Sequence, residues 1–208
     1  MFSRILYEGG SAPAIRVLAD RKLRIARQDA ALFLSDNHKQ KTMDYYDWNQ
    51  FVKRITIHVP TQVVYDAWST AKGLESWFLR KAVFYDSYGR PRGQEEKFQA
   101  GDAYLWQWYG YPDHVTEKKR ILSLNGKDFL QFRFSGDCIV SVKIKSENNE
   151  TVCELEQHDF PEDDQEKIDL HIGCSTGWTF YLANLKSILE GGIDLRNKNI
   201  DIEDVVNA

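Results

Sequence analysis

The sequence is poor in cysteine, has no long apolar run and shows no excess of positive charge. Its three cysteines, Cys138, Cys153 and Cys174, stand far apart without a Cys-x-x-Cys pair, so they indicate neither a disulfide framework nor a thiolate zinc site. The longest apolar run of the N-terminal region, residues 30–34, is far shorter than the ~20 residues that cross a bilayer. These absences predict a cytoplasmic protein that is neither exported nor embedded in a membrane.

The charge balance excludes further classes of partner. The 27 Lys and Arg residues against 31 Asp and Glu residues give a net charge of −4, which provides no general attraction for nucleic acid or for an anionic membrane surface. His58 and His114 have no second histidine at helical spacing, and the acidic run at residues 162–164 lacks the spacing of a calcium loop. We therefore predict no nucleic-acid partner, no membrane partner and no bound metal.

The sequence also offers little for catalysis or for cofactor binding. No glycine-rich phosphate loop precedes a predicted helix. His158 and Asp159 form the most enzyme-like pair, but neighbouring strand residues point to opposite faces, so the two side chains can meet only if the strand ends there. We predict no cofactor and assign no catalytic residue.

The 208 residues are enough for one domain with a full hydrophobic core. Residues 1–42 carry arginines among small apolar residues without a clear apolar helix face, and we predict a loosely ordered N-terminal extension there. This extension is a mobile tail, a transit-like sequence, or upstream residues that precede a natural start at Met43. The domain is predicted at residues 43–196, followed by an acidic tail at residues 197–208.

The middle of the chain alternates between apolar and polar residues, as β-strands do. Phe51, Ile55 and Ile57 share one face of the first strand, and two short helices follow it. The later runs are separated by turn residues such as Asn125-Gly126, and strands so close in sequence pair antiparallel because a parallel return needs a longer crossover. The predicted strands cover residues 51–59, 82–85, 103–109, 115–124, 129–134, 138–145 and 151–158.

A long amphipathic helix is predicted near the C-terminus. Its apolar residues follow the i, i+3, i+4, i+7 spacing from Trp178 to Leu189, and Gly191-Gly192 ends it. Gly173 and Gly177 lower the helix propensity but allow the sheet or a ligand to approach closely. One face of the sheet is apolar and needs a cover. We therefore predict an α+β, helix-grip fold in which a curved antiparallel sheet wraps around this long C-terminal helix.

Several landmarks in the sequence resemble a known family. They are Val59-Pro60-Thr61, Val64 to Trp68, Glu75-Ser76-Trp77-Phe78, Gly101 to Trp106, Gly177-Trp178 and Leu189-Glu190-Gly191. Their order and spacing over residues 51–196 resemble the domain named after the activator of the heat-shock protein 90 ATPase, within the START-like (SRPBCC, helix-grip) superfamily. The resemblance implies a pocket between the concave face of the sheet and the final helix, without implying a particular reaction.

Aromatic residues are abundant enough to line such a pocket, because they make up 13% of the sequence and include six Trp. The alternative is that these large rings fill the core and leave no cavity. The sequence does not fix which strand face points inward, since a one-residue bulge reverses the alternation. The ligand-binding candidates are Trp68, Trp77, Tyr104, Trp106, Trp108, Phe132, Phe134, His158, Trp178 and Leu182.

Three functions follow as hypotheses. The first is binding of a small hydrophobic or aromatic molecule. The second is an enzyme of the cyclase or hydratase type that uses Asp137, Cys138 and His158 as acid or base groups. The third is a chaperone-regulating module that has a protein partner, a closed core and an exposed apolar patch. A cavity of at least ~300 Å³ beside the final helix separates the first two from the third. The oligomeric state is not predicted.

Overall fold

The computed structural model describes residues 46–199 and 201–202. The extension predicted at residues 1–42 lies outside the described residues, and so do residue 200 and residues 203–208 of the predicted tail.

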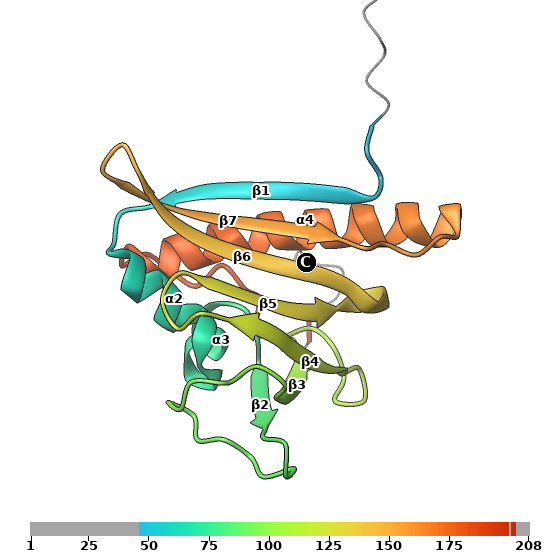
Figure 1. Cartoon of the computed structure of the whole chain (residues 1–208), viewed down its shortest axis with the longest axis horizontal. Coiled ribbons are helices and arrows are strands. Elements are labelled where there is room, and N and C mark those ends of the chain that lie inside the picture. Colours follow the sequence, from blue (N-terminus) through green and yellow to red (C-terminus); the bar gives the residue numbers. More distant parts are fainter. Residues whose placement is uncertain (1–45, 200, 203–208) are drawn as a thin grey trace, which may run out of the picture. The chain divides into compact units, whose positions relative to one another are not determined.

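The strands form one antiparallel sheet of seven strands, in the order β1-β7-β6-β5-β4-β3-β2 (Figure 1). From β2 to β7 each strand pairs with its neighbour in the chain, as their short connections require. The exception is β1, which pairs along the whole of β7. Together with the long final helix, this sheet confirms the predicted helix-grip fold. The strands are β1 (Gln50–Ile57), β2 (Lys81–Tyr85), β3 (Ala103–Gln107), β4 (Glu117–Leu124), β5 (Phe129–Phe134), β6 (Cys138–Glu147) and β7 (Glu150–His158).

Three of the predicted strands are too long, and the first of them, predicted at residues 51–59, ends at Ile57. The run predicted at residues 103–109 ends at Gln107, and the run predicted at residues 115–124 begins only at Glu117. The connection between β3 and β4 therefore leaves the sheet and contains Trp108, Tyr111 and Val115. The ladder between β4 and β5 also shifts in register between Ile121 and Ser123, which is the kind of irregularity that alternation alone does not reveal.

The helix α4 (Asp164–Leu189) lies along one face of the sheet (Figure 1). Asp163 caps its N-terminus, because the carboxylate accepts a hydrogen bond from the Glu166 backbone N–H at 2.9 Å. Gly191 follows its C-terminus with a φ of 79°, which glycine adopts without strain. The apolar side chains that α4 buries against the core are Trp178, Tyr181, Leu182 and Leu185.

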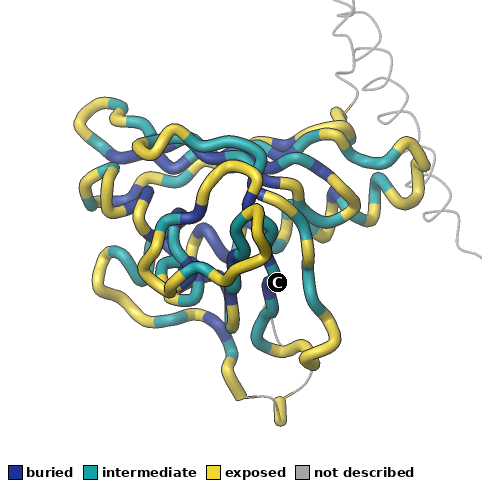
Figure 2. The backbone as a smooth tube through the Cα atoms, turned by 60° about the horizontal axis from the view of Figure 1, so that its bottom comes forward, coloured by how far each residue is buried: buried dark blue, intermediate teal, exposed yellow. Residues whose placement is uncertain are grey.

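Two short helices, α2 (Thr61–Ser69) and α3 (Ala71–Trp77), close one end of the core. Trp68 and Trp77 pack edge to face with ring centroids 4.6 Å apart, and the Trp77 indole N–H donates to the Ala67 carbonyl at 3.1 Å. The buried residues concentrate in the strands and helices, while the exposed residues lie mainly in the loops (Figure 2).

Arg196, after the end of α4, satisfies the carbonyls at the C-terminal end of α3. Its guanidinium donates to the carbonyl oxygens of Glu75, Ser76 and Leu79 at 2.9–3.1 Å, and it pairs with Asp194 at 2.6 Å. Because the last carbonyls of a helix have no partner within the helix, this buried arginine fixes the end of α3 and thereby the position of the residues that follow it.

The other face of the sheet carries charged pairs across β1, β7 and β6. Arg54 and Lys145 both pair with Glu154, at 3.1 and 2.8 Å, and Lys143 pairs with Glu156 at 3.3 Å. Exposed pairs of this kind contribute little to stability, but they keep this face solvated and leave the concave face for the core.

Candidate functional site

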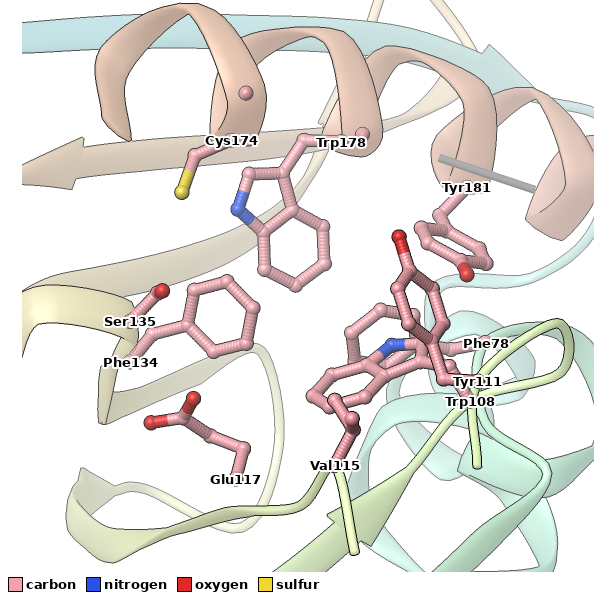
Figure 3. A pocket seen from close by; sticks show the side chains of 12 residues that line it. Phe78, Trp108, Tyr111, Val115, Glu117, Phe134, Ser135, Cys174, Trp178 and Tyr181 are labelled. Atoms are coloured by element: carbon pink, nitrogen blue, oxygen red, sulfur yellow. The ribbon is translucent and has the colours of Figure 1, made fainter. Parts of the chain in front are cut away.

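A pocket of about 300 Å³ opens beside the middle of α4 (Figure 3). Its walls come from α4, from the residue after α3, from the end of β5 and from the β3–β4 connection. The lining residues are Phe78, Trp108, Tyr111, Val115, Glu117, Phe134, Ser135, Gly173, Cys174, Gly177, Trp178 and Tyr181. The wall is therefore mainly aromatic, with few polar groups.

The pocket exists because this part of α4 carries small side chains. Gly173 and Gly177 both line it, one turn apart. A Cβ atom added at Gly173 would meet no heavy atom within 4 Å, so the space beside this glycine is open. The two glycines reduce the helix propensity of α4, and they leave room that larger residues would occupy.

The aromatic walls contact one another and hold fixed orientations. The Trp178 ring centroid lies 5.2 Å from that of Phe134 and 5.0 Å from that of Phe78, and Phe78 lies 5.8 Å from Trp108. The Trp178 indole N–H donates to the side-chain oxygen of the buried Gln157 at 2.9 Å. Trp178 is thus positioned by a hydrogen bond on one edge while its ring faces the pocket.

A carboxyl group and a thiol group also line the pocket. Burial raises the pKa of the Glu117 carboxyl above its ordinary range; the positive charge of Lys119 opposes that shift and the negative charge of Asp137 adds to it. Burial also raises the pKa of the Cys174 thiol to about 11, so the thiol is protonated near neutral pH and is a poor nucleophile.

Three of the predicted ligand-binding residues line this pocket. They are Trp108, Phe134 and Trp178. Six others lie in the buried core and do not line it. These are Trp68, Trp77, Tyr104, Trp106, Phe132 and Leu182.

Tyr104 and Trp106 show why core positions were difficult to separate from pocket positions. The two rings stack on each other with centroids 3.9 Å apart on the inward face of β3, and Phe84 and Phe98 pack beside them. The Tyr104 hydroxyl donates to the Arg133 carbonyl at 2.6 Å. These residues share a face with the pocket wall, but other rings cover them.

His158, the remaining predicted residue, lies apart from the aromatic pocket. It is the last residue of β7, and the strand does end there, because Asp159 has a φ of 59°. The His158 ring nitrogen Nδ1 lies 2.9 Å from the Asp159 carboxylate. This pair lines a separate, open and polar hollow with Asn49 and Gln50. The other groups of the enzyme hypothesis, Asp137 and Cys138, do not line the aromatic pocket either.

The segment Gly173-Cys174-Ser175-Thr176-Gly177 matches the Gly-x-Ser-x-Gly pattern of serine hydrolases. In those enzymes the serine occupies a sharp turn between a strand and a helix. Here the motif lies inside α4, and the Ser175 carbonyl accepts a hydrogen bond from the Thr179 hydroxyl one turn later. The structure therefore gives Ser175 no nucleophile elbow.

Sequence reasoning missed several lining residues. Phe78 was named only within a family landmark, and Tyr111 and Val115 lie in a connection without periodicity. Glu117 and Ser135 lie at element ends, where their orientation depends on the exact boundary. For Gly173 and Gly177 there was a signal, since two glycines one turn apart in an amphipathic helix mark a close approach or a space.

Metal and membrane features are absent from the part of the chain that the structure describes. No group of three or more His, Cys, Asp or Glu residues among residues 46–199 and 201–202 could hold a metal ion. No helix in those residues has the length and the apolar character needed to cross a bilayer.

Comparison with solved structures finds the same fold in several bacterial proteins. A protein from Staphylococcus saprophyticus, SSP2350, is 18% identical with a TM-score of 0.56, over 71% of this chain and 96% of that one. The Aha1 dimer from Colwellia psychrerythraea is 18% identical with a TM-score of 0.53, over 69% and 97%. DynU16, from the dynemicin biosynthetic locus, is 17% identical with a TM-score of 0.54, over 72% and 50%. At these identities the likeness establishes the fold alone.

Comparison with the curated proteins finds no match. The family model described as "Activator of Hsp90 ATPase homolog 1-like protein" matches residues 58–190, a range that runs from the end of β1 to the end of α4 and includes every lining residue of the pocket. The match covers more than half of the chain and agrees with the helix-grip architecture. The chain therefore belongs to the family of activator of Hsp90 ATPase homolog 1-like proteins.

Proposed function

We propose that this protein binds a small hydrophobic or aromatic molecule in the pocket beside α4. The observation that supports the proposal is an aromatic-walled space of about 300 Å³ next to the final helix. Ligand sites in proteins begin at about this volume and are mostly apolar with a few polar groups. The START-like fold of the family commonly binds hydrophobic ligands.

The lining suits a flat, mostly apolar molecule. Trp178, Phe134 and Trp108 offer ring faces and edges at fixed orientations, so a planar ligand gains contact area without ordering flexible side chains. Glu117 and Ser135 supply polar groups that can fix its orientation.

A thermal-shift screen tests the proposal. The panel contains fatty acids, sterols, flavonoids and fused-ring aromatics, because a ligand that binds only the native state raises its melting temperature. Hits are confirmed by quenching of tryptophan fluorescence, since Trp108 and Trp178 border the space. We expect hits among small aromatics. Failure of every class would contradict the proposal and favour the protein-interaction hypothesis.

A variant that narrows the pocket gives the specific control. Gly173→Leu places a side chain where the pocket is open, and we expect it to weaken binding at least tenfold while the fold is kept. Thr176→Leu adds the same side chain at an exposed position of α4 that does not line the pocket, and it should bind as the parent does. Equal binding by both variants would place the ligand elsewhere.

A further inference from the structure

Glu117 is the one carboxylate among the twelve residues that line the pocket. Within the described residues it forms neither a hydrogen bond nor an ion pair, and it is half-buried beside aromatic rings. Figure 3 shows its side chain next to Phe134, across the pocket from the α4 residues Cys174 and Trp178. A half-buried carboxylate without a partner is costly to keep, because burial removes part of its hydration.

The nearest basic side chain does not neutralise this carboxylate. Lys119 lies two residues further along β4, but its ammonium is 2.6 Å from the Asp137 carboxylate. Arg133 is also engaged there, since its guanidinium donates to the Asp137 carbonyl at 2.9 Å. No Lys or Arg belongs to the described lining. Among the described residues that line the pocket, no basic side chain is therefore available to pair with the Glu117 carboxylate.

The rings around the pocket favour the same sign of charge. The face of an aromatic ring carries partial negative charge, and Trp attracts a cation most strongly among the aromatic side chains. Trp108, Trp178, Phe78 and Phe134 all border the space. An ammonium group there would meet ring faces as well as the carboxylate of Glu117.

The entrance of the pocket is acidic. A wider, open hollow of about 830 Å³ shares Tyr111, Ser135, Gly173 and Cys174 with the pocket. Its remaining lining comes from the first turns of α4, and no Lys or Arg takes part in it. These residues are Asp163, Gln165, Glu166, Asp169 and Leu170. Asp163 caps α4, and the positive end of that helix offsets some of this charge, but Asp169 lies beyond the first turn. An acidic entrance attracts cations and repels anions as they approach.

We propose that the ligand of this pocket is an organic cation, an amine on an aromatic or fused-ring body, whose charge pairs with Glu117. The ring body fills the aromatic pocket, the ammonium group lies against the carboxylate, and the acidic entrance selects against carboxylate-bearing molecules. This inference rests on the proposed function, since it names the ligand class of the same pocket.

Three probes that differ in charge test by calorimetry whether the pocket prefers a cationic ligand. They are 2-naphthylmethylamine, its neutral counterpart 2-naphthylmethanol and the anion 2-naphthoate, which share the ring body. We expect the amine to bind the full-length protein at least tenfold more tightly than the alcohol, and the carboxylate to bind most weakly. If none of the three binds, the proposed function fails and this inference fails with it. If the alcohol or the carboxylate binds as tightly as the amine, only the inference on charge is overturned.

The variant Glu117→Gln separates the contribution of the carboxylate to binding from the contribution of the aromatic rings. We expect the preference for amine over alcohol to disappear while the alcohol keeps its affinity, because the ring walls are unchanged. Glu162→Gln removes the same charge from an exposed position outside the lining and should keep the preference. A preference that survives Glu117→Gln, or that is lost equally in Glu162→Gln, would contradict the role of Glu117. The comparison of probes on the parent protein needs no variant, so the test does not depend on how Glu117→Gln folds.

Discussion

The two halves of α4 face the same sheet, but one half mainly fills the core and the other half borders an open space. The C-terminal half buries Leu182 and Leu185 in the core away from the pocket, and only its first residues, up to Tyr181, border the space. The N-terminal half presents the small residues Gly173 and Cys174 to the pocket, and the space beside Gly173 is open. The comparison shows that the size of the helix residues decides where a helix-grip sheet is filled and where it is open. Stability should therefore depend on the filled half, and ligand binding on the open half.

The largest expected effect is a loss of folding stability when a buried aromatic ring is removed from the core. Trp77 is fully buried, packs against Trp68 and donates to the Ala67 carbonyl. Trp77→Ala should lower the free energy of unfolding by about 3–5 kcal/mol, because it removes a large buried ring and leaves a cavity and an unmatched carbonyl. Urea unfolding measures this. A loss below ~1 kcal/mol would show that this region is less tightly packed than the structure indicates.

Arg196 should be the next most sensitive position. Its side chain is 2% exposed and holds three carbonyls around the end of α3 as well as Asp194. Arg196→Met should cost about 3 kcal/mol, because it leaves those carbonyls without their donor and removes one of the cations that pair with Asp194. Arg90→Met, which removes an exposed arginine paired with Asp86, should cost at most ~1 kcal/mol. Equal melting temperatures for the two variants would contradict the role of Arg196 as a clamp on α3.

Acid should weaken the ion pair between Asp194 and Arg196. Burial raises the pKa of Asp194, but hydrogen bonds from Arg196 and Lys198 outweigh it and hold the pKa well below its ordinary value. A carboxylate with a depressed folded pKa contributes stability that is present above its unfolded pKa and lost as the pH falls below it. Between neutral pH and about pH 3, Asp194 should therefore account for ~1 kcal/mol of the stability lost, and the loss should continue at lower pH. Asp194→Asn should flatten that part of the curve, and an unchanged acid profile in urea titrations would argue against it.

The smallest expected effects are changes in stability at two helical glycines, and they should have opposite signs. Gly173→Ala in the open half should stabilise α4 by up to ~1 kcal/mol, because alanine favours the helix and its Cβ meets nothing within 4 Å. Gly73→Ala in α3 should destabilise, because its Cβ would lie 2.6 Å from the Asp66 carbonyl oxygen. Thermal melts of the two variants compare them directly. A loss of stability in Gly173→Ala would mean that this side of α4 is not open.

The fold was predictable because its signals are local and repeated. Alternation located every strand to within a few residues, and the apolar stripe of α4 with its terminal glycines located the covering helix. Phe132 and Trp106 point inward and are buried, although the alternation alone did not fix which strand face points inward. The register shift near Ile121 and the early end of β3 were not visible, because both depend on how neighbouring strands twist against each other.

The pocket was harder to predict than the fold, for a physical reason. Aromatic residues on one sheet face are equivalent in sequence. Only the folded structure shows that Trp106 is buried among rings such as Phe84 and Tyr104, while Phe134 stays partly exposed. Glu117 carried no signal because its environment depends on where β4 begins. Among the pocket residues, the glycines of α4 were the informative ones, since a missing side chain is visible in the sequence itself.

The pairing of β1 with β7 also has a consequence for the newly made chain. Their partners, from Gln50 with His158 to Ile57 with Thr151, lie roughly a hundred residues apart. At about 5–20 residues per second, a ribosome needs on the order of 5–20 s to extend the chain from one strand to the other. Throughout that delay β1 has no neighbour, and Lys53 and Arg54 give it the charges that discourage unpaired strands from joining those of other nascent chains.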